Sequence, residues 1–120
     1  MKLISQELID AIERERQRQE QKFPGQKLPA AWAEDGDHLP RADRACLMAG
    51  VKPEYQIKAD AKLRELSGKI TWADVLVEEV SEAISAAGRG DADHACKELI
   101  EVAAVAIRFH DALRRGECGL

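Results

Sequence analysis

The second half of the chain carries glutamates at a repeated short spacing. One Glu-x-x-Glu pattern lies in Glu78-Glu79-Val80-Ser81-Glu82, and a second lies in Glu98-Leu99-Ile100-Glu101. Residues three apart are neighbours on a helix surface, so each pattern brings two carboxylates to one face. Carboxylate oxygens are the ligands that hard divalent cations such as Mg²⁺ and Mn²⁺ prefer. The two patterns together predict a metal site.

Helical phasing directs these acids inward. At about 100° per residue, Glu79 lies inside the apolar stripe of its predicted helix, Glu82 lies at the edge of the stripe and Glu78 lies farther out. On the next predicted helix, Glu98 lies about 40° from the apolar centre and Glu101 lies at its margin. Burying unpaired carboxylates is costly and clustered like charges repel, so a cation has to balance them. Since no Lys or Arg lies in either apolar sector, a divalent metal is the favoured partner, although a single Glu-x-x-Glu pattern is also typical of a solvated helix face.

The composition predicts an all-α fold. Aromatic residues make up only 4% of the 120 residues, whereas residues that a helix accommodates at low cost, such as Ala, Leu and Glu, are abundant. Caps, prolines and glycines divide the chain into helices. We predict five of them, from Ser5 to about Lys22, Pro40 to Ala49, Pro53 to Leu66, Thr71 to Ala87, and Asp91 or Asp93 to Arg115, with a loop from Phe23 to about Leu39. This length predicts a single domain over residues 1–120, a helical bundle with a modest core.

Charge and cysteine content exclude several classes of protein. Eighteen Lys and Arg against 22 Asp and Glu give a net charge of -4, which does not attract a nucleic acid polymer. No run of about 18 apolar residues is present, so we expect no membrane span. Cys46, Cys96 and Cys118 form no paired motif and are expected to be reduced, the first two in or near the core. These features favour a cytoplasmic protein.

Mg²⁺ and Mn²⁺ favour phosphate chemistry, and a phosphate ligand needs cationic groups near the acids. Arg14, Arg18 and Lys22 repeat every four residues along the polar end of the first predicted helix. That end cannot bury a face in a core, so it either walls a wet cleft or lies in solvent. The other candidates for substrate binding are Gln26, Trp32, Trp72 and Arg108. Either Trp could stack on a base, with a core position as the alternative for Trp72. His94 has no second His at metal-ligand spacing and is assigned no role.

The two glutamate patterns resemble a known signature. Glu78-Glu79-x-x-Glu82, the 15 residues 83–97 and Glu98-x-x-Glu101 look like the motif of the all-α nucleoside triphosphate pyrophosphohydrolases of the MazG type, Glu-Glu-x-x-Glu followed by Glu-x-x-Asp. The resemblance is closest to small phage and bacterial MazG-like proteins. It extends to Glu13-Arg14-x-Arg16-Gln17 and Thr71-Trp72, covers about two thirds of the chain and omits residues 30–69. Glu101 stands where the family has Asp, and its longer arm can still reach a metal.

The resemblance implies a Mg²⁺-dependent enzyme, with Mn²⁺ as an alternative ion. Glu79, Glu82, Glu98 and Glu101 would hold the ion, Glu78 would orient or deprotonate the attacking water, and Glu78, Glu79 and Glu82 are the catalytic candidates. The implied reaction converts a nucleoside or deoxynucleoside triphosphate to the monophosphate and pyrophosphate, which clears the nucleotide pool of unwanted species. The resemblance and the modest core together favour a homodimer or homotetramer.

Two other interpretations stay open. One is a nucleotide-binding module of the same fold with weak or no turnover, which the change to Glu101 would allow. The other is a structural helical module whose inward acids pair with Arg side chains of a neighbouring subunit. Pyrophosphate release separates the enzyme from the first, and a metal requirement separates it from the second.

Overall fold

A computed structural model describes residues 2–32 and 39–120 of the chain, which form five helices and no strand. The helices are α1 (Gln6–Lys22), α2 (Arg41–Met48), α3 (Glu54–Leu66), α4 (Trp72–Gly88) and α5 (Ala92–Arg114). The all-α prediction is therefore confirmed, with each helix within two residues of its predicted bounds. Residues 33–38 of the predicted loop lie outside the described residues. Within the described ranges, no helix combines the length and the apolar character that crossing a membrane requires.

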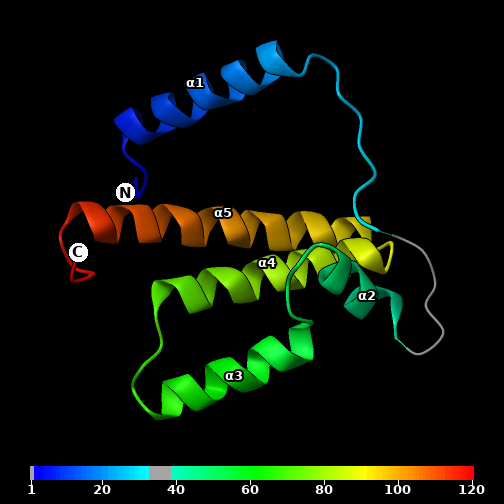
Figure 1. The fold of residues 1–120 in the computed structure, drawn as a ribbon. Coiled ribbons are helices and arrows are strands. Elements are labelled where there is room, and N and C mark those ends of the chain that lie inside the picture. Colours follow the sequence, from blue (N-terminus) through cyan, green and yellow to red (C-terminus); the bar gives the residue numbers. More distant parts are fainter. Residues whose placement is uncertain (1, 33–38) are drawn as a thin grey trace.

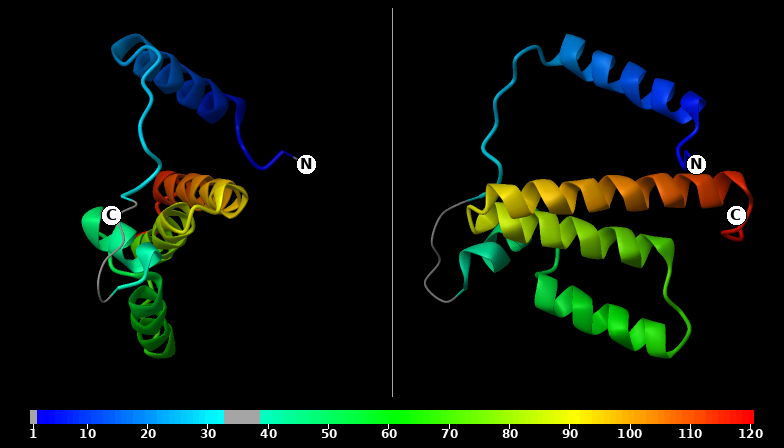
Figure 2. Two further views of the ribbon diagram at one scale, coloured as in Figure 1. Left: turned by 90° about the vertical axis from the view of Figure 1, so that its right-hand side faces the viewer. Right: turned by 180° about the vertical axis from the view of Figure 1, so that it is seen from behind.

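Helix α4 is the centre of the arrangement. Helix α5 packs along one side of α4, and α2 and α3 pack against it from the other side (Figure 1). Helices α4 and α5 run antiparallel and are joined by a short turn, in which Gly90 adopts a φ of +79°. Helix α1 lies apart from the other four helices in all three views (Figures 1 and 2), and none of its residues is buried.

The helix starts follow from local side-chain chemistry. Ser5 Oγ accepts a hydrogen bond from the Leu8 amide at 3.2 Å, and Asp91, rather than Asp93, caps α5 through the His94 amide at 3.1 Å. Helix α4 has a reciprocal capping box, because Thr71 Oγ1 accepts from the Asp74 amide and Asp74 Oδ2 accepts from the Thr71 amide. Pro40 and Pro53 occupy the position before the first helical residue of α2 and α3, one residue earlier than predicted.

The core of one chain is small and made largely of alanine. The buried hydrophobic residues are Ala45, Cys46, Ile57, Ala61, Ala83, Ala86, Ala95 and Ala112. The prediction that Cys46 is a core residue is confirmed, and its thiol lies 3.2 Å from Ser85 Oγ and 3.6 Å from the Ser81 carbonyl oxygen. The prediction for Cys96 is wrong, since Cys96 is exposed on α5.

The contact between α2 and α4 depends on a glycine inside α4. A Cβ on Gly88 would lie 2.6 Å from the Ala45 Cβ, 3.2 Å from the Arg41 carbonyl oxygen and 3.3 Å from the Ala42 Cα. A methyl group in that place would have to push α2 away. The two helices therefore approach closely because residue 88 has no side chain.

Gly88→Ala should destabilise the protein even though alanine is the better helix former. Overpacking of this kind costs about 1–3 kcal/mol, more than the roughly 1 kcal/mol that alanine contributes to a helix. The measurement is chemical denaturation of Gly88→Ala, Ala45→Gly and the double variant. The double variant should be more stable than the sum of the two single effects allows, and strict additivity would contradict the close approach.

Candidate metal centre

Four glutamates from α4 and α5 converge between the two helices. Glu79 and Glu82 lie one turn apart on α4, and Glu98 and Glu101 lie one turn apart on α5. One carboxylate oxygen from each lies within 4.8 Å of the others. The antiparallel pairing of α4 and α5 brings the two Glu-x-x-Glu patterns level with each other, as the helical phasing predicts.

The cluster contains carboxylate oxygens that are buried and have no partner among the described residues. Glu98 is only 6% exposed, and its Oε2 atom accepts no hydrogen bond there; the same holds for Glu79 Oε2. A buried acceptor left unsatisfied costs about 1–3 kcal/mol, and more when it is charged. These two oxygens therefore lack a donor or a cation.

Crowding also changes the protonation of the cluster. Burial raises the pKa of Glu79 from its ordinary value of 4.5 to about 7. The charge of Glu82, a hydrogen bond with Glu101, and the charges of Glu101 and Glu98 act in the same direction. Burial and the neighbouring charges both oppose a further negative charge on Glu79. Up to a pH of about 7 the metal-free cluster therefore holds a proton on Glu79, which a bound metal ion would displace.

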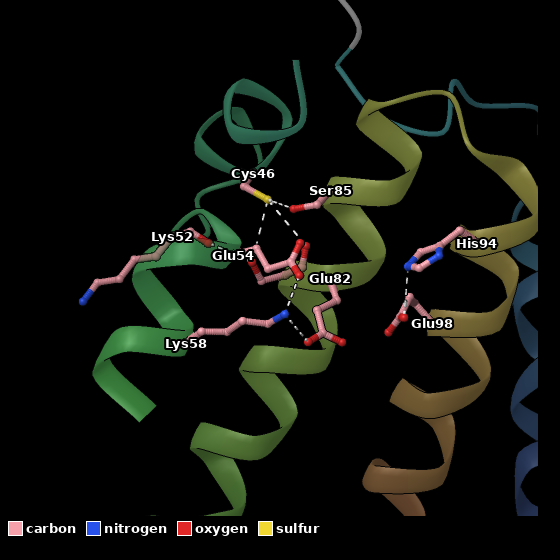
Figure 3. Close-up of polar contacts among 9 residues, drawn as sticks. Cys46, Lys52, Glu54, Lys58, Glu82, Ser85, His94 and Glu98 are labelled. Atoms are coloured by element: carbon pink, nitrogen blue, oxygen red, sulfur yellow. Dashed lines mark hydrogen bonds and ion pairs between the residues drawn. The ribbon is translucent and has the colours of Figure 1, made fainter. Parts of the chain in front are cut away.

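Two nitrogen-bearing side chains border the cluster, and neither was assigned a role from the sequence. Lys58 of α3 lies with its Nζ atom 2.7 Å from Glu54 Oε1 and 3.5 Å from Glu82 Oε1. The Nε2 atom of His94 lies 3.2 Å from Glu98 Oε1 (Figure 3). The sequence prediction considered only the Lys and Arg residues in the apolar sectors of the two acidic helices, whereas Lys58 comes from α3, which packs against α4. The i, i+4 spacing of His94 and Glu98 was the only available signal for the histidine.

The third acid of the first pattern, Glu78, does not belong to the group of four. It is half-buried on α4 and lies about 100° around the helix from its neighbour Glu79. This agrees with the predicted phasing, in which Glu78 lies outside the apolar stripe. At this position Glu78 can act beside the cluster but is not a member of it.

The predicted binding residues of the first helix are not brought to the cluster by a single chain. Arg14 is exposed on α1, and Arg18 forms an ion pair of 2.6 Å with Glu15. The Lys22 Nζ atom lies 5.3 Å from the centre of the Phe23 ring, and Gln26 is exposed in the segment that follows. Helix α1 lies apart from α4 and α5 (Figure 1), so the structure does not bring these residues to the acids. Their binding role stays a prediction.

The two tryptophans differ in their surroundings. Trp72 stacks on Phe109 with the ring centres 6.3 Å apart, and the Arg108 guanidinium lies over the Trp72 ring at 5.0 Å. This group borders a largely apolar hollow of about 700 Å³ between the start of α4 and the end of α5. Trp72 is half-buried and lines the hollow two helical turns from Glu79, so it does not belong to the buried core. Trp32, 45% exposed, lies in the segment after α1.

Comparison of the chain with known protein families, with curated proteins and with solved structures found no match. The functional proposals below therefore rest on the residues and their geometry.

Neutralising Glu79 should stabilise the metal-free protein. The folded state holds this proton up to a pH of about 7 and the unfolded chain only up to about 4.5, so its contribution to the free energy of unfolding falls as the pH rises through that interval and is constant above it. In chelator, Glu79→Gln should gain about 1–2 kcal/mol over the parent by pH 8, after allowance for screening at a partly exposed group. Thermal melts between pH 4 and pH 8 measure the difference.

The control is Glu65→Gln, at an exposed position of α3 outside the cluster, which should show no such pH-dependent gain. A Glu79→Gln protein that is less stable than the parent in chelator would mean that a buried cation had lost its partner, and would contradict the repulsive cluster.

Proposed function

We propose that the protein is a Mg²⁺-dependent nucleotide pyrophosphohydrolase that converts a nucleoside triphosphate to the monophosphate and pyrophosphate. The observation that carries the proposal is the pair of buried, unpartnered carboxylate oxygens, Glu79 Oε2 and Glu98 Oε2, within a cluster of four carboxylates. A hard divalent cation satisfies both oxygens and removes the repulsion among the four groups. The donor set fits Mg²⁺ or Mn²⁺ and contains none of the thiolates that Zn²⁺ often takes.

The four acids have one role in this proposal, which is to hold the ion between α4 and α5. When bound, Mg²⁺ neutralises charge on the triphosphate and lowers the pKa of a coordinated water. The water oxygen forms a bond to the α-phosphorus while the bond from this phosphorus to the oxygen that bridges to the β-phosphate breaks, and pyrophosphate leaves. Glu78, beside the cluster, accepts the proton of the water. The resemblance to the MazG type supports the same assignment.

Cationic side chains complete the phosphate site in this proposal. Lys58 is placed to serve there, because its Nζ atom already lies 3.5 Å from Glu82 and about half of its side chain stays exposed. An ion at the acids would free this ammonium for a phosphate oxygen. Arg108, with its guanidinium over Trp72, lies toward the hollow where a base could stack. Arg14, Arg18, Lys22 and Gln26 would be supplied by the first helix of another chain in a homodimer or homotetramer.

A second candidate is a structural helical module without turnover, favoured by one observation. The Lys58 ammonium already lies 3.5 Å from Glu82 and His94 contacts Glu98, so Lys58 balances part of the negative charge without a metal. The buried Oε2 atoms of Glu79 and Glu98 argue against this candidate, because neither Lys58 nor His94 forms a hydrogen bond with them. The metal-free melts of Glu79→Gln distinguish the two candidates.

Turnover should require the metal and all four acids. Pyrophosphate release from a panel of nucleoside triphosphates should occur with Mg²⁺ or Mn²⁺ and stop in excess chelator. Glu98→Gln should abolish it together with most of the metal-induced stabilisation, which for the parent should be about 2.7 kcal/mol at 100 times the dissociation constant. If the metal raised the melting temperature but no pyrophosphate were released, the protein would be a binding module without turnover. Turnover in excess chelator would refute the proposal.

Lys58→Gln should raise the KM for the nucleotide by about tenfold, the size expected from the loss of one charge-assisted hydrogen bond. The fold should be retained, because an exposed ion pair contributes little to stability. Steady-state kinetics at saturating Mg²⁺ measure the change. The matched control is Lys52→Gln, which removes a lysine that pairs with Asp60, 3.1 Å away, instead of with the cluster. If Lys58→Gln and Lys52→Gln changed the KM equally, Lys58 would have no binding role.

A further inference from the structure

The two carboxylate oxygens of Glu98 lie in different surroundings. Glu98 is the one fully buried member of the cluster of four acids, with 6% of its surface exposed. Its Oε1 atom lies 3.2 Å from the Nε2 atom of His94 (Figure 3), whereas its Oε2 atom is buried and accepts no hydrogen bond among the described residues. One oxygen therefore has a polar neighbour, and the other is left for a ligand.

The start of α5 fixes the position of His94. The Asp91 side chain accepts a hydrogen bond from the His94 amide at 3.1 Å, and the Asp91 carbonyl oxygen accepts one from the Ala95 amide at 2.9 Å. Residues four apart are neighbours on a helix surface, so the cap that fixes His94 also places its ring beside Glu98. The contact between the two side chains is thus built into the first turns of α5.

His94 borders the cluster without belonging to it. The group of possible ligand atoms that lie within 4.8 Å of one another consists of the four glutamates, without His94. An effect of His94 on a bound ion would therefore pass through Glu98. An imidazole can donate a hydrogen bond from Nε2 while it carries no charge. It can thus engage one oxygen of a carboxylate without cancelling the negative charge that attracts a cation, unlike the ammonium of Lys58 beside Glu82.

The number of oxygens that a carboxylate offers bears on which ion it binds. Mg²⁺ requires near-octahedral coordination at about 2.0–2.1 Å, whereas Ca²⁺ takes more ligands at about 2.3–2.6 Å and accepts both oxygens of one carboxylate. A carboxylate with one oxygen engaged by a neighbouring side chain offers only the other. Such a contact favours the smaller ion, and loss of a side chain that orients a metal ligand typically changes metal affinity by about 10- to 100-fold.

We propose that His94 is a positioning residue of the metal centre, which engages Glu98 Oε1, leaves Oε2 for the ion and thereby makes the site select Mg²⁺ over Ca²⁺. The inference rests on the metal centre of the proposed function and not on the hydrolysis of a nucleotide. Binding of Mg²⁺ without release of pyrophosphate would therefore leave it standing.

Calorimetric titration of the full chain with Mg²⁺ alone and with Ca²⁺ alone tests the proposal. The parent should bind Mg²⁺ more tightly than Ca²⁺. His94→Ala should lower the Mg²⁺ affinity by about 10- to 100-fold and the Ca²⁺ affinity by a smaller factor, because Glu98 is then free to offer both oxygens. The ratio of the two affinities is the quantity to compare, since a loss of folded protein would reduce the binding of both ions alike.

Two further substitutions separate the contact with Glu98 from any effect of His94→Ala on folding. The amide nitrogen of glutamine lies about as far along the side chain as the Nε2 atom of histidine, whereas that of asparagine corresponds to Nδ1. His94→Gln should therefore restore the ratio of the parent, and His94→Asn should not. The matched control is His110→Ala, which removes a similarly exposed histidine of α5 that contacts Asp111 at 3.0 Å and should leave both affinities unchanged.

The possible failures are distinguishable. An unchanged ratio in His94→Ala, or the same ratio in His94→Gln and His94→Asn, would overturn the role of His94 and leave the metal centre intact. A parent that binds Ca²⁺ as tightly as Mg²⁺ would overturn the selectivity. A parent that binds neither ion would overturn this inference and the proposed function together.

Discussion

Repulsion among four carboxylates in a partly dry space is the constraint on which the interpretation of this fold depends. Glu79, Glu82, Glu98 and Glu101 place their oxygens within 4.8 Å of one another, and burial combined with neighbouring charge raises the pKa of Glu79 to about 7. Helical propensity does not require acids at these inward positions, and a core of apolar residues there would be more stable. A site that retains its acids despite this cost is typical of function. Glu79 Oε2 and Glu98 Oε2 show the same excess of acceptors over donors, because both are buried and accept no hydrogen bond among the described residues.

The scaffold around the cluster opposes this repulsion with close packing and helix caps. Cys46 of α2 is fully buried against two serines of α4, and Gly88 lets α2 and α4 approach at the end of α4 that joins the turn to α5. The capping box at Thr71 fixes the other end of α4. Helix α3 adds Lys58, whose ammonium balances part of the negative charge without filling the cluster. These contacts hold α4 against α2 and α3, and the packing of α5 along α4 brings the two acid pairs level with each other.

The same chain leaves much apolar surface uncovered. The core of a single copy is mostly alanine, while leucines and isoleucines of α1 and α5 remain exposed. Burial of apolar area is the main favourable contribution to folding, so these exposed side chains contribute little to the stability of a single chain. The four acids lie between α4 and α5, whereas Leu99 and Ile100 of α5 are exposed.

The sequence by itself determined the helices and the inward phase of the acids. Caps at Ser5, Thr71 and Asp91 and the stop at Gly90 are local signals, and a helix repeats every 3.6 residues whatever surrounds it. Only the tertiary structure decided which helices meet. Packing between segments distant in the sequence decides that Lys58 of α3 reaches Glu82, that Cys96 is exposed and that α1 lies apart from α4. Such contacts form through shape and buried area summed over many residues, for which a single sequence contains no local pattern.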